Sequence, residues 1–245
     1  MLHGTKFRRS AFFSGMSNTD PLDLEFEVKG FAEDLLSRVL MCLEGQPLPD
    51  DLRIGASPDG RRFTFSYKQT LHAKADGPTV GMLQLDYALG FDRTDSYLAV
   101  HSSTFQLRDG RGKRPIVRFE YAREATRVPC SHIHVHAQSG LFTQLLAATG
   151  HKSPAAVESV HLPTGGDRFR PCVEDFVEFL IVECGVAGRS GWRDEVKQGR
   201  EKWREYQTAS AVRDRPEVAI EVLERLGLSV SGEISHERPS PRDRF

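Results

Sequence analysis

The sequence RFTFSYK at residues 62–68 decides the fold class, because apolar and polar side chains alternate along it. The side chains of Phe63, Phe65 and Tyr67 take every second position. Successive side chains of a β-strand point to opposite faces of a sheet, so this alternation is typical of a strand with one buried face. The sequence LQLDY at residues 83–87 repeats the pattern. We therefore expect a sheet with one face packed on a core.

Further strand-like runs follow at residues 97–107, 115–123 and 130–137. Turn sequences rich in Asp and Gly separate the runs, as in DGRG at residues 109–112, and no helical pattern lies between them. Short connections of this kind favour hairpins. The pattern therefore predicts an α+β fold, with an antiparallel five- or six-stranded meander covered on one face by helices and a helical C-terminal part.

Apolar residues at helical spacing predict the helices that flank this sheet. We expect them at residues 20–43, 140–149, 171–184, 192–211 and 216–226. The C-terminal helices among these should pack at the end of the sheet. The domain organisation that follows is a disordered leader (1–19), a single α+β domain (20–230, with the sheet at 62–138 and the helical part at 140–230) and a disordered tail (231–245).

Composition narrows the class of protein. Of 245 residues, 39% are hydrophobic and 27% are charged, which is typical of a globular chain. Lys and Arg total 33 and Asp and Glu total 34, so no global field attracts nucleic acid or an anionic membrane. No apolar run is long enough to span a bilayer, and no secretory signal is evident. We therefore expect a soluble cytoplasmic protein.

The four cysteines have neither the spacing of metal ligands nor the density of a disulfide framework. We expect reduced, mostly buried thiols at Cys42, Cys130, Cys172 and Cys184.

A run of alternating histidines, SHIHVHA at residues 131–137, is the most distinctive feature of the sequence. In a strand, His132, His134 and His136 would share one face. Ile133 and Val135 would point the other way, toward the helices. The imidazoles are then expected on the face of the sheet that the helices leave uncovered.

Two charged residues are expected beside these histidines. If residues 115–123 pair with 130–137 and Phe119 faces the core, Arg118 and Glu120 lie on the histidine face. Such a group supports metal binding, acid–base chemistry or anion binding. The candidate catalytic residues are His132, His134, His136, Arg118 and Glu120, and the candidate ligands of a divalent metal are His132, His134 and His136. An ordinary half-exposed sheet presents similar side chains, so this alternative stays open.

The residues HIHVHAQ at 132–138 resemble the motif of the histidine-triad family of nucleotide hydrolases and transferases. The resemblance implies that His134 attacks a nucleotide α-phosphate while His132 and His136 assist. The chain departs from the pattern at Gln138, where the motif has an apolar residue. The family also places a helix among the strands that precede its motif, whereas this chain is expected to form hairpins there.

A second candidate site is the turn HLPTGGDRFRP at residues 161–171, which precedes a predicted helix. Paired glycines and arginines before a helix N-terminus can hold an anion. The alternative is a tight surface turn that starts the helix. The candidate anion-binding residues are Thr164, Gly165, Gly166, Arg168 and Arg170. A strand meander followed by this turn and a long helix also resembles uncharacterised bacterial proteins, which implies an architecture and no activity.

Outside the histidine run, the sequence has no complete catalytic motif and no strong nucleic-acid-binding signature. The leading hypothesis is therefore a binding or regulatory protein, with a protein or a nucleotide as partner. The alternative is an enzyme that acts on the phosphate of a nucleotide or a nucleic acid through the histidine cluster.

Overall fold

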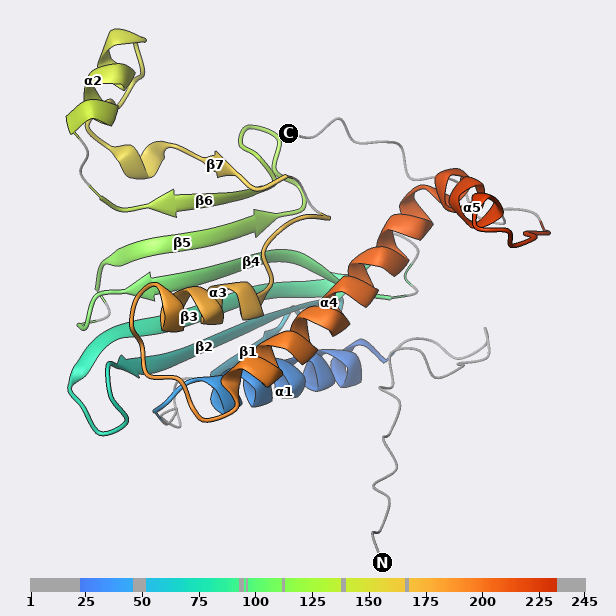
Figure 1. Ribbon diagram of the computed structural model, residues 1–245, viewed down its shortest axis with the longest axis horizontal. Helices are drawn as coiled ribbons and strands as arrows, with labels where there is room; N and C mark the ends of the chain where they lie inside the picture. The colour runs from blue at the N-terminus through green and yellow to red at the C-terminus, as the bar shows by residue number, and fades with distance from the viewer. Residues whose placement is uncertain are drawn as a thin grey trace, which may run out of the picture.

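The computed structural model describes residues 23–45, 52–92, 95, 97–111, 113–137, 140–165 and 168–232. A seven-stranded sheet runs through these residues, and every neighbouring pair of strands is antiparallel (Figure 1). The strands follow one another in chain order, which confirms the expected meander. They are β1 (Leu52–Ala56), β2 (Arg62–His72), β3 (Thr79–Phe91), β4 (Leu98–Arg108), β5 (Pro115–Ala122), β6 (Ser131–Val135) and β7 (Leu162–Pro163).

The sheet has seven strands rather than the expected five or six, because the sequence pattern did not predict the two edge strands. All five residues of β1 are exposed, so its sequence shows no alternation of buried and exposed positions. Strand β7 has two residues and pairs only with His132 and Ile133. Neither strand is long or patterned enough to give the periodic signal that identifies the other five.

The helices lie close to their expected positions. They are α1 (Leu24–Cys42), α2 (Gly140–Ala148), the 3₁₀ turn η2 (Val157–Ser159), α3 (Val173–Val182), α4 (Trp192–Asp214) and α5 (Pro216–Arg225). Helix α1 begins after Asp23, whose carboxylate accepts a hydrogen bond of 3.1 Å from the backbone N–H of Phe26. In the described part of the chain, no helix is both long and apolar enough to cross a membrane. The expected leader and most of the expected tail lie outside the described residues.

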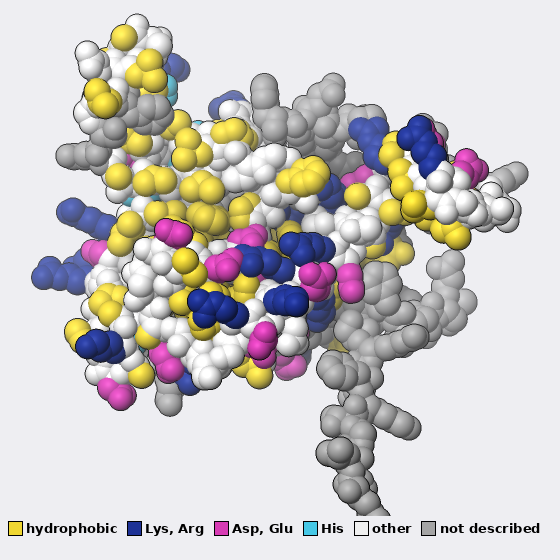
Figure 2. Space-filling view, in the orientation of Figure 1, with side chains coloured by type: hydrophobic (Ala, Val, Ile, Leu, Met, Phe, Trp, Pro, Cys, Tyr) yellow, Lys and Arg dark blue, Asp and Glu magenta, His cyan; other side chains and the backbone are white. Residues whose placement is uncertain are grey.

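The helices cover one face of the sheet, as expected (Figure 1). Helices α1 and α3 contact the strands, while α4 packs on α1 and α3, and α5 contacts α4. This corrects the expectation that the last helices pack at the end of the sheet, because α4 instead adds to the helical layer. Lysine, arginine and acidic side chains are interspersed over this layer in Figure 2.

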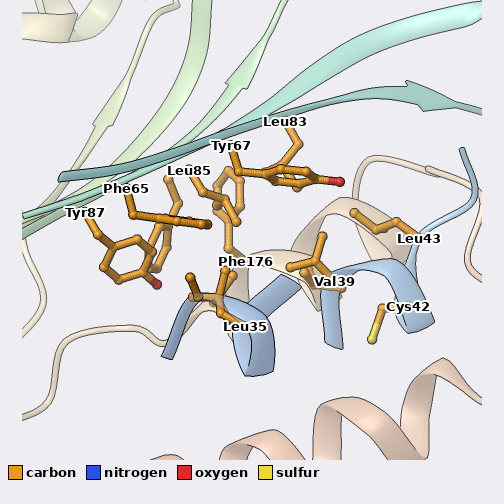
Figure 3. Packing of buried hydrophobic residues seen from close by; sticks show 14 of the residues in the cluster. Leu35, Val39, Cys42, Leu43, Phe65, Tyr67, Leu83, Leu85, Tyr87 and Phe176 are labelled. Carbon is orange, nitrogen blue, oxygen red and sulfur yellow. The ribbon is translucent and has the colours of Figure 1, made fainter. Parts of the chain in front are cut away.

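The core lies between α1, α3 and the middle strands (Figure 3). Phe65 and Tyr67 of β2 are almost completely buried, as are Leu83 and Leu85 of β3 and Phe176 of α3. Burying one large apolar side chain contributes about 1.5–3 kcal/mol, so this layer is the main source of stability. The buried residues occupy alternate positions of β2 and β3, which leaves the other set of alternate residues on the uncovered face.

The strand register arranges the uncovered face into rows of residues across the sheet. One row runs from β2 to β6 through Lys68, Gln84, Gln106, Arg118 and His134. The adjacent row runs through Ser66, Asp86, Thr104, Glu120 and His132. The fold therefore brings Arg118, Glu120 and two histidines together at the β5–β6 end of a polar surface.

Candidate metal centre

The pairing of β5 with β6 fixes the positions of four candidate residues. Arg118 lies opposite His134, and Glu120 lies opposite His132. Directly opposed residues of antiparallel strands point to the same face, so all four side chains share the face away from the helices. This is the arrangement that the alternating sequence predicts.

A third imidazole completes the cluster from outside β6. His161 lies just before β7, and its ring centroid is 4.7 Å from those of both His132 and His134. The His132 and His134 rings are 4.8 Å apart. One ligand atom from each of the three residues lies within 4.8 Å of the other two. The three rings therefore surround a common point.

Hydrogen bonds to the backbone fix the tautomers of two rings. Nδ1 of His132 lies 2.7 Å from the carbonyl oxygen of Pro129, and Nδ1 of His134 lies 2.6 Å from that of Glu158. A carbonyl oxygen can only accept, so each Nδ1 carries a hydrogen and donates it. In the neutral rings, each Nε2 then presents a lone pair.

Both Nε2 atoms lie next to one carboxylate oxygen. Oε2 of Glu120 is 3.2 Å from Nε2 of His132 and 3.2 Å from Nε2 of His134. Three lone-pair atoms this close need a hydrogen or a cation among them, which can be a proton on a ring, a proton on the carboxyl group or a metal ion. Two ligands at ~2.1 Å from a tetrahedral zinc lie about 3.4 Å from each other, close to the separation of these atoms.

Burial distinguishes this cluster from ordinary surface histidines. His132 is 4% exposed and His134 is 5% exposed. Burial lowers the pKa of His161, and the neighbouring His132 and His134 lower it further. The neutral form of an imidazole is the form that binds metals, so the environment of His161 favours a ligand over a cation.

Arg118 borders the cluster on β5. One of its terminal nitrogens is 3.2 Å from Oε1 of Glu120, the oxygen that does not face the histidines. Its Nε is buried and has no hydrogen-bond partner among the described residues. The guanidinium therefore contacts Glu120 through one terminal nitrogen, and its Nε hydrogen has no acceptor among the described residues.

His136, expected from the sequence as a third metal ligand, lies outside the group of ring nitrogens formed by His132, His134 and His161. Strand β6 ends at Val135, and the backbone N–H of His136 bonds to the carbonyl oxygen of Ile116 at 2.8 Å. Burial lowers the pKa of His136, and the charge of Arg118 lowers it further. Its Nε2 is buried without a hydrogen-bond partner in the described part of the chain. The third imidazole beside His132 and His134 is that of His161.

Sequence reasoning missed His161 because the residue lies beyond a long excursion from β6. The pairing of His132 with Pro163 and of Ile133 with Leu162 gives the register. One step further along the same register leads to His134 and His161. A two-residue strand carries no periodic signal, so only the pairing itself reveals this neighbour.

In the turn expected to bind an anion, both arginines contact other parts of the protein. Arg168 forms a 2.7 Å ion pair with Asp214 at the end of α4. The guanidinium of Arg170 lies 4.0 Å from the ring centroid of Tyr121 and 4.8 Å from that of Trp203. These contacts link the turn to α4 and, through Tyr121, to β5.

The other residues of this turn add no charged donor. Thr164 Oγ1 lies 2.6 Å from Ser131 Oγ, so its hydroxyl is also engaged within the protein. Gly165 has a φ of 92° and is exposed, and Gly166 lies outside the described residues. A tight turn that precedes α3 accounts for these contacts.

The cysteines are free thiols and lie outside the histidine cluster. Cys42, Cys130 and Cys172 are buried, while Cys184 is exposed. Burial raises the pKa of Cys42 to about 12. That thiol is therefore protonated at neutral pH and is a poor metal ligand.

Comparison of this chain with protein-family models, with curated proteins and with solved structures found no match. The geometry of the site is therefore the basis for inferring a function.

Proposed function

We propose that this protein binds a divalent transition metal through ring nitrogens of His132, His134 and His161, with Glu120 as a fourth ligand. The observation that carries the proposal is the convergence of two Nε2 atoms on one carboxylate oxygen, each at 3.2 Å. The opposite nitrogen of each ring donates to a backbone carbonyl. Metal-binding histidines are held in the same way in known metal sites.

A metal ion would satisfy the lone pairs of the whole cluster. Protons on His132 and His134 would each serve one ring beside Glu120 and would leave the adjacent ring of His161 unserved. A single divalent ion would instead interact with all of the lone pairs at once.

Zinc is the ion that we expect to fit best. Imidazole nitrogens suit Zn, Cu, Fe and Ni, and zinc binds four nitrogen or oxygen ligands in a tetrahedron. A zinc ion bound between these side chains would act as a Lewis acid on an oxyanion. The protein's own contribution would be to orient the ligand atoms through the carbonyls of Pro129 and Glu158, and to hold Glu120 through Arg118.

Covalent catalysis of the histidine-triad kind has less support. His134 would need an open Nε2 to attack a phosphate, whereas Glu120 Oε2 lies 3.2 Å from that atom. Without a metal, the carboxylate would repel the incoming anion. We therefore favour a metal-dependent binding protein over a nucleotide-transferring enzyme with a histidine nucleophile.

A competition titration tests the metal site. Protein stripped with a chelator is titrated with zinc in the presence of a chromophoric competitor. We expect wild type to bind one zinc per chain and His161→Gln to bind more than about a hundredfold more weakly, since loss of an outer partner alone costs 10–100-fold. His151→Gln, a substitution of a histidine outside the cluster, should match wild type. No zinc binding by wild type, or equal binding by His161→Gln, would refute the proposal.

A further inference from the structure

Two polar groups beside the proposed metal centre have unmet hydrogen-bonding capacity. They are Nε of Arg118 and Nε2 of His136, both buried and both without a hydrogen-bond partner among the described residues. A buried polar atom left unpaired costs free energy, so native proteins pair nearly all of them. Two such atoms next to one cluster indicate a place for a bound group.

The two side chains lie on adjacent strands at the same side of the cluster. Arg118 is paired with His134, and His136 follows two residues later, beyond the end of β6. Alternate residues of an extended chain share a face, and diagonal neighbours across a strand pair are within reach of long side chains. Arg118 and His136 therefore flank the side of the metal centre that is formed by His134.

We propose that this site binds a phosphate group, with one oxygen on the metal and others accepting hydrogen bonds from Arg118 and His136. The proposal rests on the proposed metal site and specifies its ligand. Arginine is suited to this role because its guanidinium can donate two parallel hydrogen bonds to one phosphate.

The number of contact points favours phosphate over a carboxylate. A bound metal, Arg118 and His136 would each offer the ligand a separate contact. A phosphate monoester has three free oxygens and can meet all three, whereas a carboxylate has two. A phosphate oxygen can join a four-coordinate zinc as a fifth ligand.

The charges point to the same ligand. Three neutral imidazoles contribute no charge, and one charge of a divalent ion is offset by Glu120. The remaining metal charge and that of Arg118 leave two positive charges, which match a phosphate dianion. The side chain of Arg118 is 29% exposed, so it lies partly at the surface of the uncovered face.

Isothermal titration of the zinc-loaded full chain with inorganic phosphate tests this inference. Zinc affinity is measured first for every variant, so that failure of the metal site is seen separately. We expect Arg118→Gln to bind phosphate about tenfold or more weakly, as loss of a charged hydrogen bond should cause, while still binding zinc. His136→Gln should also weaken phosphate binding. Metal-free wild type should bind phosphate at least about tenfold more weakly than the zinc form.

Lys68→Gln is the matched control, because Lys68 lies in the same cross-strand row as Arg118 but on β2. It removes one positive charge from the same face and should leave phosphate binding unchanged. If Arg118→Gln lost zinc, Arg118→Lys would replace it, with weaker phosphate binding expected because lysine cannot donate a bidentate pair.

Three results would overturn the phosphate site. They are a zinc-loaded wild type that does not bind phosphate, an Arg118 variant that holds zinc and binds phosphate as well as wild type, and acetate binding as tight as that of phosphate.

Discussion

The hydrogen on Nδ1 of His132 and on Nδ1 of His134 determines what this histidine face can bind. Each is donated to a backbone carbonyl, so both rings present Nε2 to Glu120. Had the rings donated from Nε2 to the carboxylate, the cluster would be an ordinary hydrogen-bonded group. The proposed metal site therefore depends on the backbone around residues 129 and 158, which sets the orientation of both rings.

The zinc affinities expected of the His136 and His161 variants differ, which gives a prediction at the scale of residues. His136→Gln should retain the zinc affinity of wild type within about threefold, because its ring lies outside the ligand group. Competition titration with a chromophoric chelator measures this affinity. If His136→Gln lost zinc as completely as His161→Gln does, the proposed ligand set would be incorrect.

A histidine far from the site predicts how stability depends on pH. Burial lowers the pKa of His101, and Arg62 and Arg123 lower it further, against opposing effects of the Phe91 carbonyl and Glu124. The unfolded chain therefore binds more protons than the folded protein as pH falls through about 6.5. The contribution of His101 is fully favourable above that pH and is lost below it.

His101→Gln should consequently show a shallower loss of unfolding free energy between about pH 7 and pH 5 than wild type. Urea denaturation at a series of pH values measures this slope. An identical slope in the two proteins would show that His101 has no lowered pKa.

Four residues of the candidate site could be predicted from sequence, and one could not. Alternation along two adjacent strands placed His132, His134, Arg118 and Glu120 on one face, since that inference needs only local periodicity. His161 could not be found in this way. Its position depends on where a chain excursion of more than twenty residues returns to the sheet edge, and the local sequence does not encode this.

At the scale of elements, a buried ion pair joins the helical layer. Arg38 of α1 donates to Glu174 of α3 at 2.9 Å, and Glu174 is 5% exposed. Asp34 contacts Arg38 and also pairs with Lys202 of α4 at 2.6 Å. The three helices are thus linked by these ion pairs.

Glu174→Gln should destabilise the protein by about 3 kcal/mol, because it leaves the charge of Arg38 partly uncompensated in a buried site. Glu25→Gln breaks an exposed pair with Lys29 on α1 and should leave the free energy of unfolding close to that of wild type. Chemical denaturation of both variants checks the contrast. Similar values for the two would mean that the buried pair does not stabilise the helical layer.

The strands with long alternating patterns were predictable because one face of each packs on the helices. Strands β2 and β3 show this alternation of buried and partly exposed residues. Strand β1 is exposed throughout and β7 has only two residues, so their pairing is decided by neighbouring strands. The position of α4 could not be predicted from the sequence either, because its packing on α1 and α3 depends on tertiary contacts.

At the scale of the whole molecule, stability and the proposed function occupy opposite faces of one sheet. The covered face holds the core, and the uncovered face carries the polar rows that end at the histidine cluster. Helix α5 lies outside both, since it has no buried residues and contacts α4.

One substitution made at two places tests this division. Val177 of α3 is 2% exposed and Val222 of α5 is 48% exposed. Val177→Ala should lower the free energy of unfolding by about 2 kcal/mol, whereas Val222→Ala should change it by less than about 0.5 kcal/mol. Urea denaturation measures both, and a large loss in Val222→Ala would show that α5 belongs to the cooperative core.

The proposed function depends on His132, His134, His161 and Glu120 forming one metal site. Anomalous diffraction at the zinc edge, from crystals of the full chain with one equivalent of zinc, tests it most directly. We predict a single strong peak about 2.0–2.2 Å from Nε2 of His132 and from Nε2 of His134, with His161 and Glu120 completing the coordination. Stoichiometric zinc at another position, or no peak between these side chains, would contradict it.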